Sequence, residues 1–272
     1  LCSLLYENTP LANPILGTQE SVRAFTRETL MDYMGRHYMP NNIVISCAGH
    51  FERQRLMDEL NRRFSGGGLG ERSARKVSAL TGGHRFRAVE KDIEQVHLCL
   101  GFPGFALDED GQYALFVLNN ALGGSMSSRL FQEVREKLGL AYSVYSYVSA
   151  FQECGSLVIY AGVNPASADK AYEEIGKVVA GMRENGITRD EFLRGREQMK
   201  SSMLFSQEST PSQMLLYGKY MLFNDQIFDF EGKLDAINAV SEEDVREAIA
   251  LTFDESQKAV GAVGNTDKPF SL

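Results

Sequence analysis

The sequence lacks the residue patterns that bind metals and nucleic acids. It has no tryptophan, and its four histidines, His37, His50, His84 and His97, stand apart from one another. No two of them are close enough to bind a metal from one helix, and no C-x-x-C pair is present. Acidic residues outnumber basic ones, 36 to 28, so the chain has no electrostatic footprint for nucleic acid. We therefore expect neither a bound metal nor a nucleic-acid partner.

Long apolar segments are also missing. No apolar run approaches the roughly 18 residues that cross a bilayer, and the opening LCSLLYENTP has neither the charged start nor the cleavage site of a signal peptide. Cys47 and Cys99 lie within apolar patterns and are interpreted as buried thiols of a reducing compartment. With 43% hydrophobic and 24% charged residues, the composition is typical of a globular protein. We expect it in the cytoplasm, as in bacteria, without a membrane partner.

The most informative stretch is GGSMSSRLFQEVREKLGLAYSVYSY, residues 123–147. Glycines and serines lead into a predicted helix with one apolar stripe, formed by Leu130, Phe131, Val134 and Leu138. Gly139 ends this helix, because glycine tolerates the left-handed backbone that closes helices. The residues after it are aromatic, β-branched or small, which predicts a strand.

Arg135 and Tyr142 lie on either side of that reversal, seven residues apart. The turn could therefore bring a guanidinium and a phenol to one point, where they could hold a peptide carbonyl and stabilise an oxyanion. The alternative interpretation is structural: Arg135 complements the helix dipole and Tyr142 packs beside the sheet. Spacing by itself favours this alternative.

Periodicity elsewhere predicts an α+β fold. Helices are expected over residues 26–39, 52–64, 110–122, 166–184, 188–205, 211–222 and 230–252, and strands over 43–48, 96–102, 155–163 and 257–263. Thr188 and Glu191 have the spacing of a capping box. Residues 65–84 are rich in glycine, serine and charge, as in linkers between domains. Residues 1–20 are predicted to be loop-like.

One internal repeat is visible. Residues 26–50 and 241–265 align without gaps, with Thr26 opposite Ser241 and Gly49 opposite Gly264. Each segment is predicted to be a capped helix, a turn, an apolar strand and a glycine. If the same separation between the two segments also applies to the start of the second half, about 130 residues of an equivalent first half lie ahead of Leu1.

Several stretches resemble one family. SSRLFQEVREKLGLAYSVYS closely resembles the Arg/Tyr segment of pitrilysin/insulinase-type zinc peptidases, in the bacterial branch related to the mitochondrial processing peptidase. Residues 11–22, 38–51 and 241–264 also resemble the family. The resemblance implies mostly antiparallel sheets flanked by helices. It further implies that residues 1–72 are the remainder of a first, zinc-bearing domain, 73–87 a linker, and 88–272 a complete second domain without metal.

The resemblance also assigns roles. Arg135 would bind substrate and Tyr142 would contact the substrate carbonyl or oxyanion, while zinc would be held in the first half. That half requires an H-x-x-E-H motif, which this chain lacks, and DGQYALFVLNNAL (110–122) occupies the equivalent place in the second half. We therefore expect no zinc on this chain and no activity from it alone.

Two functions are left open. The chain is either the substrate-gripping part of a zinc metalloendopeptidase that cuts peptides in a closed chamber, or a metal-free partner or scaffold subunit of a peptidase complex. The expected partners are a peptide substrate, a missing N-terminal segment of the same protein, and a second subunit in a homodimer or heterodimer.

Overall fold

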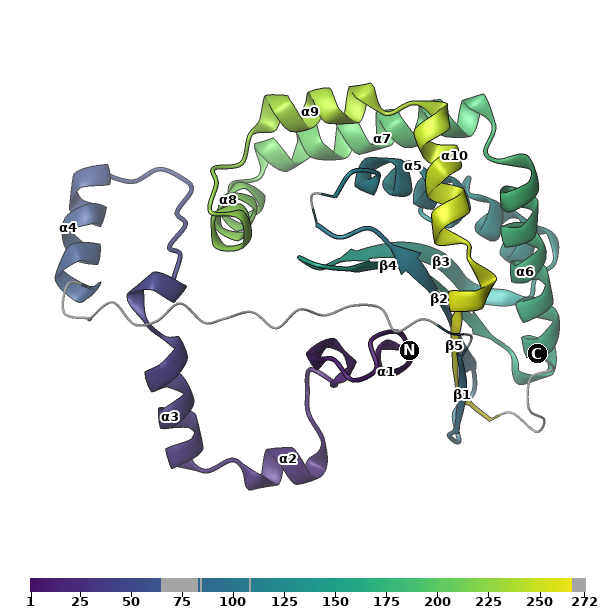
Figure 1. The fold of residues 1–272 in the computed structure, drawn as a ribbon, viewed down its shortest axis with the longest axis horizontal. Coiled ribbons are helices and arrows are strands. Elements are labelled where there is room, and N and C mark those ends of the chain that lie inside the picture. The colour runs from purple at the N-terminus through teal and green to yellow at the C-terminus, as the bar shows by residue number, and fades with distance from the viewer. Residues whose placement is uncertain (65–82, 84, 108, 266–272) are drawn as a thin grey trace. The chain divides into compact units, whose positions relative to one another are not determined.

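The strands in the described part of the chain form one mixed sheet, as the computed structural model shows (Figure 1). The structure describes residues 1–64, 83, 85–107 and 109–265. Strands β1 (Arg85–Glu90), β2 (Val96–Gly104), β3 (Ala141–Ala150), β4 (Gly155–Val163) and β5 (Ala259–Gly264) lie in the order β1-β5-β2-β4-β3. Only the β1–β5 pair is parallel. The predicted α+β class and mostly antiparallel sheet are confirmed.

Two compact units make up the chain. The first contains Leu1–Asn13, Val77–Lys200 and Leu234–Leu272, and therefore the whole sheet; the second contains Pro14–Lys76 and Ser201–Lys233. The predicted linker falls mainly on residues outside the described ones, although β1 begins at Arg85, within the predicted range 73–87. The division at 72 and 88 into halves of a duplicated chain is not tested by these units and stays a prediction.

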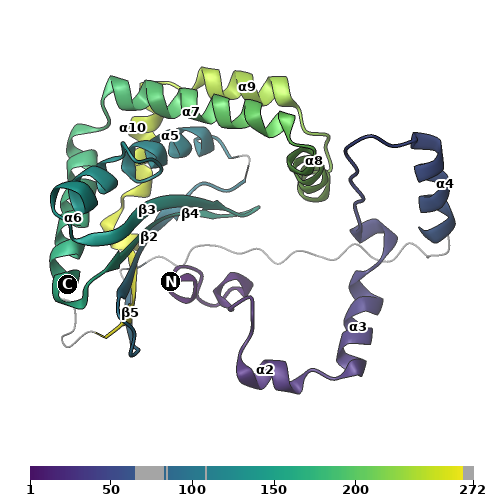
Figure 2. The ribbon, with the colours of Figure 1, turned by 180° about the vertical axis from the view of Figure 1, so that it is seen from behind.

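Helices cover one face of the sheet in the first unit (Figures 1 and 2). They are α5 (Gln112–Leu122), α6 (Ala168–Asn185), the start of α7 (Arg189–Glu208) and α10 (Glu242–Thr252). Leu98, Leu100 and Phe102 point from β2 into this layer and are almost completely buried. Phe102 meets Phe253 edge to face, with ring centroids 5.3 Å apart. Burial of this apolar layer is the main stabilising contribution to the unit.

The opposite face is partly covered by the start of the chain. Helix α1 (Cys2–Leu5) and the 3-10 turn η1 (Pro10–Ala12) lie here, and Leu4, Leu5 and Tyr6 are buried. The Tyr6 hydroxyl donates to Ser156 Oγ at 3.0 Å. The prediction that residues 1–20 are loop-like was thus wrong for α1, because a helix of four residues is too short to show a period.

The second unit has no buried residue among those that the structure describes. It contains α2 (Gln19–Ala24), α3 (Arg27–His37), the 3-10 turn η2 (Pro40–Asn42), α4 (Arg53–Phe64) and α8 (Thr210–Asn224), together with the end of α7 and the start of α9 (Phe230–Ala239). The helices predicted from Thr26 and over 52–64 are confirmed.

The strand predicted over residues 43–48 is wrong. This segment has no regular structure, its apolar side chains from Ile43 to Ile45 are 36–45% exposed, and Cys47 is exposed rather than buried. A strand needs a hydrogen-bonded neighbour, and the described part of this unit contains no strand. The apolar composition was therefore insufficient to make one.

The repeat is visible in the structure with matching element bounds. Helices α3 and α10 each begin after a capping hydroxyl, that of Thr26 or Ser241. Each is followed by a 3-10 turn, η2 or η5 (Glu255–Gln257), and then by a glycine with positive φ. Burial differs, however. On α10, Val245, Ile249 and the following Phe253 are buried, whereas their counterparts are 46–63% exposed: Leu30, Met34 and Tyr38. The two segments share local structure, but only the second packs on a sheet.

Candidate functional site: the Arg135/Tyr142 segment

The loop before Arg135 is fixed against β3 by a glycine. The Ser146 N–H donates to the carbonyl of Gly123 at 3.2 Å. A Cβ on Gly123 would lie 2.5 Å from the Ser146 nitrogen, so a larger residue would force the loop and the strand apart. The glycine thus determines where the following helix starts.

Arg135 lies in a π-helical turn, η3 (Phe131–Lys137). Leu130 and Val134 are fully buried beneath it. Gly139, with φ of 60°, closes the turn: its N–H donates to the Arg135 carbonyl at 3.0 Å, and the next N–H, of Leu140, reaches the Val134 carbonyl at 2.9 Å. The predicted end at Gly139 is confirmed. π-Helical turns are rare and occur frequently at functional sites.

Tyr142 occupies a β-bulge at the start of β3. Ala141 pairs with Val163 and Ser143 with Gly162, so Tyr142 is an extra residue without a partner of its own on β4. Ala141 and Val144 belong to the helix-side core, while Tyr142 is 65% exposed. In a regular strand, Tyr142 would share the buried face with Val144 and Ser146, because side chains alternate. The bulge instead directs its phenol outward, as bulges near active sites often do.

The two predicted site residues are both exposed. The Arg135 guanidinium lies 4.8 Å from the centre of the Phe131 ring, and its Nε is 4.0 Å from a carboxylate oxygen of Glu136. No hydrogen bond joins Arg135 to Tyr142, both of which lie in the described part of the chain. The structure presents an exposed guanidinium and an exposed phenol on the two sides of one turn.

An ion pair that the sequence analysis missed holds this segment in place. Arg129 donates to both carboxylate oxygens of Glu191, at 2.8 and 2.7 Å, and to the Gly186 carbonyl at 3.0 Å. The Thr188 N–H also donates to Glu191, at 2.7 Å, as the predicted capping box requires. Burial opposes ionisation of Glu191, but the hydrogen bonds from Arg129 and Thr188 lower its pKa. The capping box was visible in the sequence; the pairing with Arg129 was not.

Beyond Tyr142, the exposed face of β2, β3 and β4 carries an aromatic patch, which we define as Tyr145, Tyr147, Tyr160 and His97. Tyr145 lies opposite Tyr160, with ring centroids 4.9 Å apart. The Tyr160 hydroxyl shares a hydrogen bond of 2.7 Å with Nδ1 of His97. Burial raises the pKa of Tyr147 and of Tyr160.

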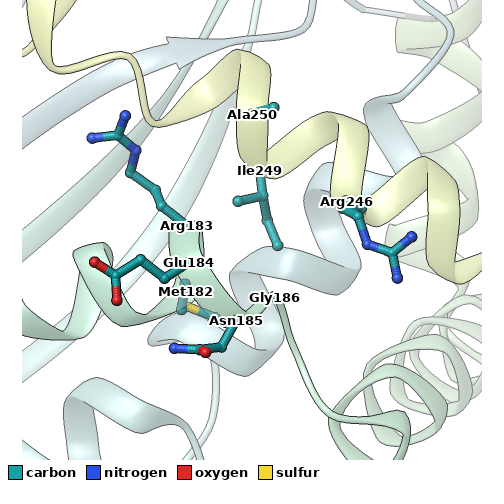
Figure 3. A pocket seen from close by; sticks show the side chains of 8 residues that line it. All are labelled: Met182, Arg183, Glu184, Asn185, Gly186, Arg246, Ile249 and Ala250. Carbon is teal, nitrogen blue, oxygen red and sulfur yellow. The ribbon is translucent and has the colours of Figure 1, made fainter.

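A separate cavity of about 350 Å³ lies between the end of α6 and α10 (Figure 3). Met182 and Ile249 are its buried apolar side chains. Figure 3 shows the guanidinium groups of Arg183 and Arg246 pointing away from each other, and Arg246 is paired with Glu243. These two positive charges therefore do not converge on one point of the cavity.

Among the residues described, no three or more His, Cys, Asp or Glu side chains gather where they could hold a metal ion. His97 is committed to Tyr160. The donor set in this part of the protein therefore does not fit a catalytic zinc, which requires three protein ligands. Within the same ranges, no helix is long and apolar enough to cross a membrane.

The first unit is thus a mixed α+β unit that exposes the phenol of Tyr142 and the guanidinium of Arg135 on one segment. Residues 24–199 match the family model described as "Peptidase M16 inactive domain". The chain belongs to the peptidase M16 family, which confirms the family resemblance of its sequence.

Curated relatives include the uncharacterized zinc protease YmxG of Bacillus subtilis, 38% identical over 94% of this chain, and the uncharacterized zinc protease SCO5738 of Streptomyces coelicolor, 34% identical over 89%. The chain spans 62% and 54% of their lengths.

Two solved structures share the fold. The peptidase M16 inactive domain from Pseudomonas fluorescens has a TM-score of 0.86 at 22% identity, covering 99% of this chain and 65% of its own. A protease from Helicobacter pylori has a TM-score of 0.83 at 21% identity, covering 97% and 64%.

Proposed function

We propose that this chain is the substrate-gripping part of a zinc-dependent metalloendopeptidase whose zinc is bound by a preceding half of the same protein. The match to the inactive domain of a peptidase family carries this proposal. The names of the relatives as zinc proteases and their greater length support it. So does the lack of a metal-binding group among the described residues.

The proposed roles follow from the exposed groups. Tyr142 donates its O–H to the peptide carbonyl, and this bond strengthens as negative charge develops on the oxygen. Arg135 binds a second carbonyl or a carboxylate of the substrate through its planar set of donors. Because no internal hydrogen bond joins these two groups, neither has to break such a bond before binding peptide.

The repeat supports the preceding half as partner. The exposed face of α3, with Leu30, Met34 and Tyr38, corresponds position by position to the face that α10 buries against its own sheet. Exposed apolar faces of this kind usually mark an interface. We propose that the preceding half supplies the sheet and covers this face.

The decisive experiment compares peptide hydrolysis by the full-length protein and by this chain. We expect hydrolysis by the zinc-loaded full-length protein, loss of it with a chelator, recovery with added zinc, and none from the chain alone. Zinc-independent hydrolysis, or hydrolysis by the isolated chain, would contradict the proposal.

The second candidate is a metal-free partner or scaffold subunit in a homodimer or heterodimer. The observation that favours it is the family model itself, which is described as inactive. Zinc content of the purified full-length protein separates the two candidates. About one zinc per chain supports the peptidase, and none supports the partner subunit.

A further inference from the structure

We propose that the aromatic patch (Tyr145, Tyr147, Tyr160 and His97) is a subsite that binds an aromatic side chain of a peptide next to Tyr142. The inference rests on the proposed function, because it places the patch beside the group that contacts the substrate backbone. The proposed subsite would select the side chain of the peptide, whereas Arg135 and Tyr142 contact only its backbone or a carboxylate.

The sheet register places the patch beside Tyr142. Tyr145 lies opposite Tyr160, and Ser143 lies opposite Gly162, which in turn pairs with His97. The bulge adds Tyr142 immediately before Ser143, and both are exposed. A peptide that contacts Tyr142 could therefore reach Tyr145 through a neighbouring side chain.

One end of this face is closed and the other is open. Around Gly101, the side chains of Leu1 and Leu5 approach so closely that a Cβ there would lie 2.7 Å from Leu5. By contrast, Tyr145 and Tyr147 are 44% and 42% exposed. Residues of α1 thus cover the sheet around Gly101, while the patch retains accessible ring surface.

A glycine makes room for the patch. A Cβ on Gly162 would lie 3.0 Å from Gln95 Oε1 and 3.3 Å from the Tyr160 hydroxyl. Because Gly162 has no Cβ, the Tyr160 side chain can lie across the sheet and form a hydrogen bond with His97. The hydrogen bond fixes the ring, so a ligand binds a preformed surface and less side-chain freedom is lost.

The ring geometry of the patch suits an aromatic ligand. No Lys or Arg side chain lies over its rings within the described ranges. Aromatic rings prefer offset or edge-to-face neighbours 4.5–7 Å apart, and the tyrosine pairs already lie at 4.9 and 6.2 Å.

The test measures binding, which needs no zinc. Fluorescein-labelled pentapeptides that differ only in a central Phe, Leu or Lys are titrated with the 272-residue chain, and their anisotropy is followed. We expect the Phe peptide to bind about three- to tenfold more tightly than the other two. Tyr145→Leu and Tyr160→Leu should remove this preference, whereas Tyr160→Phe, which keeps the ring, should retain most of it. Tyr172→Leu, on α6 and outside the patch, is the control and should leave the preference for the Phe peptide unchanged.

Preferred binding of the Lys peptide, equal binding of all three, no measurable binding, or a Phe preference that survives in Tyr145→Leu and Tyr160→Leu would overturn the inference. Circular dichroism checks that each variant is folded. Hydrolysis of the same peptides by the zinc-loaded full-length protein is measured separately. An absence of hydrolysis would count against the proposed function. The binding preference tests the subsite independently of hydrolysis.

Discussion

Arg129 and Glu191, 62 residues apart in the sequence, are joined by two hydrogen bonds of 2.8 and 2.7 Å that connect the start of the Arg135 helix to the corner between α6 and α7. Their side chains are only 25% and 12% exposed. Such bidentate, charge-assisted pairs are geometrically specific. The segment that carries Arg135 and Tyr142 is therefore attached to the helical layer at a defined point.

Breaking this pair should destabilise the first unit. We expect Arg129→Ala to lower the free energy of unfolding by about 1–3 kcal/mol, because a half-buried carboxylate loses its partner. Urea unfolding measures the change. The matched control is the exposed pair of Arg189 and Glu242, where Arg189→Ala should cost less than about 1 kcal/mol. Equal costs at both sites would show that the Arg129 pair has no special role.

The same pair predicts a pH dependence. The pKa of Glu191 is lowered in the folded state, so its contribution to stability is present above the unfolded pKa, about 4.3. That contribution is lost as pH falls through the folded pKa. Glu191→Gln should therefore cost stability at pH 7 and progressively less as the pH falls below 4.3. Urea unfolding of both proteins across this range checks the prediction; a difference that grows on acidification would contradict it.

Tyr142→Phe should lower kcat of the full-length enzyme by about 10²-fold, the usual cost of removing one oxyanion donor. The melting temperature should hardly change, because the phenol is exposed. Tyr172→Phe serves as the control on the helical layer. An unchanged kcat would exclude the proposed role of Tyr142.

Gly139 should resist substitution because of its left-handed backbone. Gly139→Ala should destabilise the chain by about 1 kcal/mol, and Gly139→Asn by less, since asparagine tolerates this conformation. Gly176, in the middle of α6 with open space around it, offers the opposite case: Gly176→Ala should stabilise by about 0.5–1 kcal/mol. Thermal unfolding of the three variants measures these changes. Equal destabilisation by Gly139→Ala and Gly176→Ala would contradict the role of the left-handed backbone at Gly139.

Residues 44–49 should become a strand when the preceding half is present. Their amides should exchange rapidly with deuterium in this chain and slowly in the full-length protein, because a paired strand protects its N–H groups. The equivalent strand β5 is the internal control and should be protected in both. Rapid exchange of residues 44–49 in the full-length protein would argue against the proposed partner.

Much of the local structure could be predicted from the sequence. Thr26 and Ser241 cap helices where predicted, and Gly139 ends a helix where predicted. These features depend on hydrogen bonds and backbone angles within a few residues. The candidate site was found through its family resemblance, because its spacing by itself favoured a structural role for Arg135 and Tyr142.

What the sequence determined by itself is the set of helices, turns and apolar segments, because each depends on neighbouring residues. Tertiary structure decided which of two equivalent apolar segments became a strand: residues 259–264 pair with β1 and β2, while residues 44–49 have no strand beside them in the described part of their unit. It also decided the outward direction of Tyr142 and the pairing of Arg129 with Glu191. These features arise only when distant segments meet, so local pattern does not contain them.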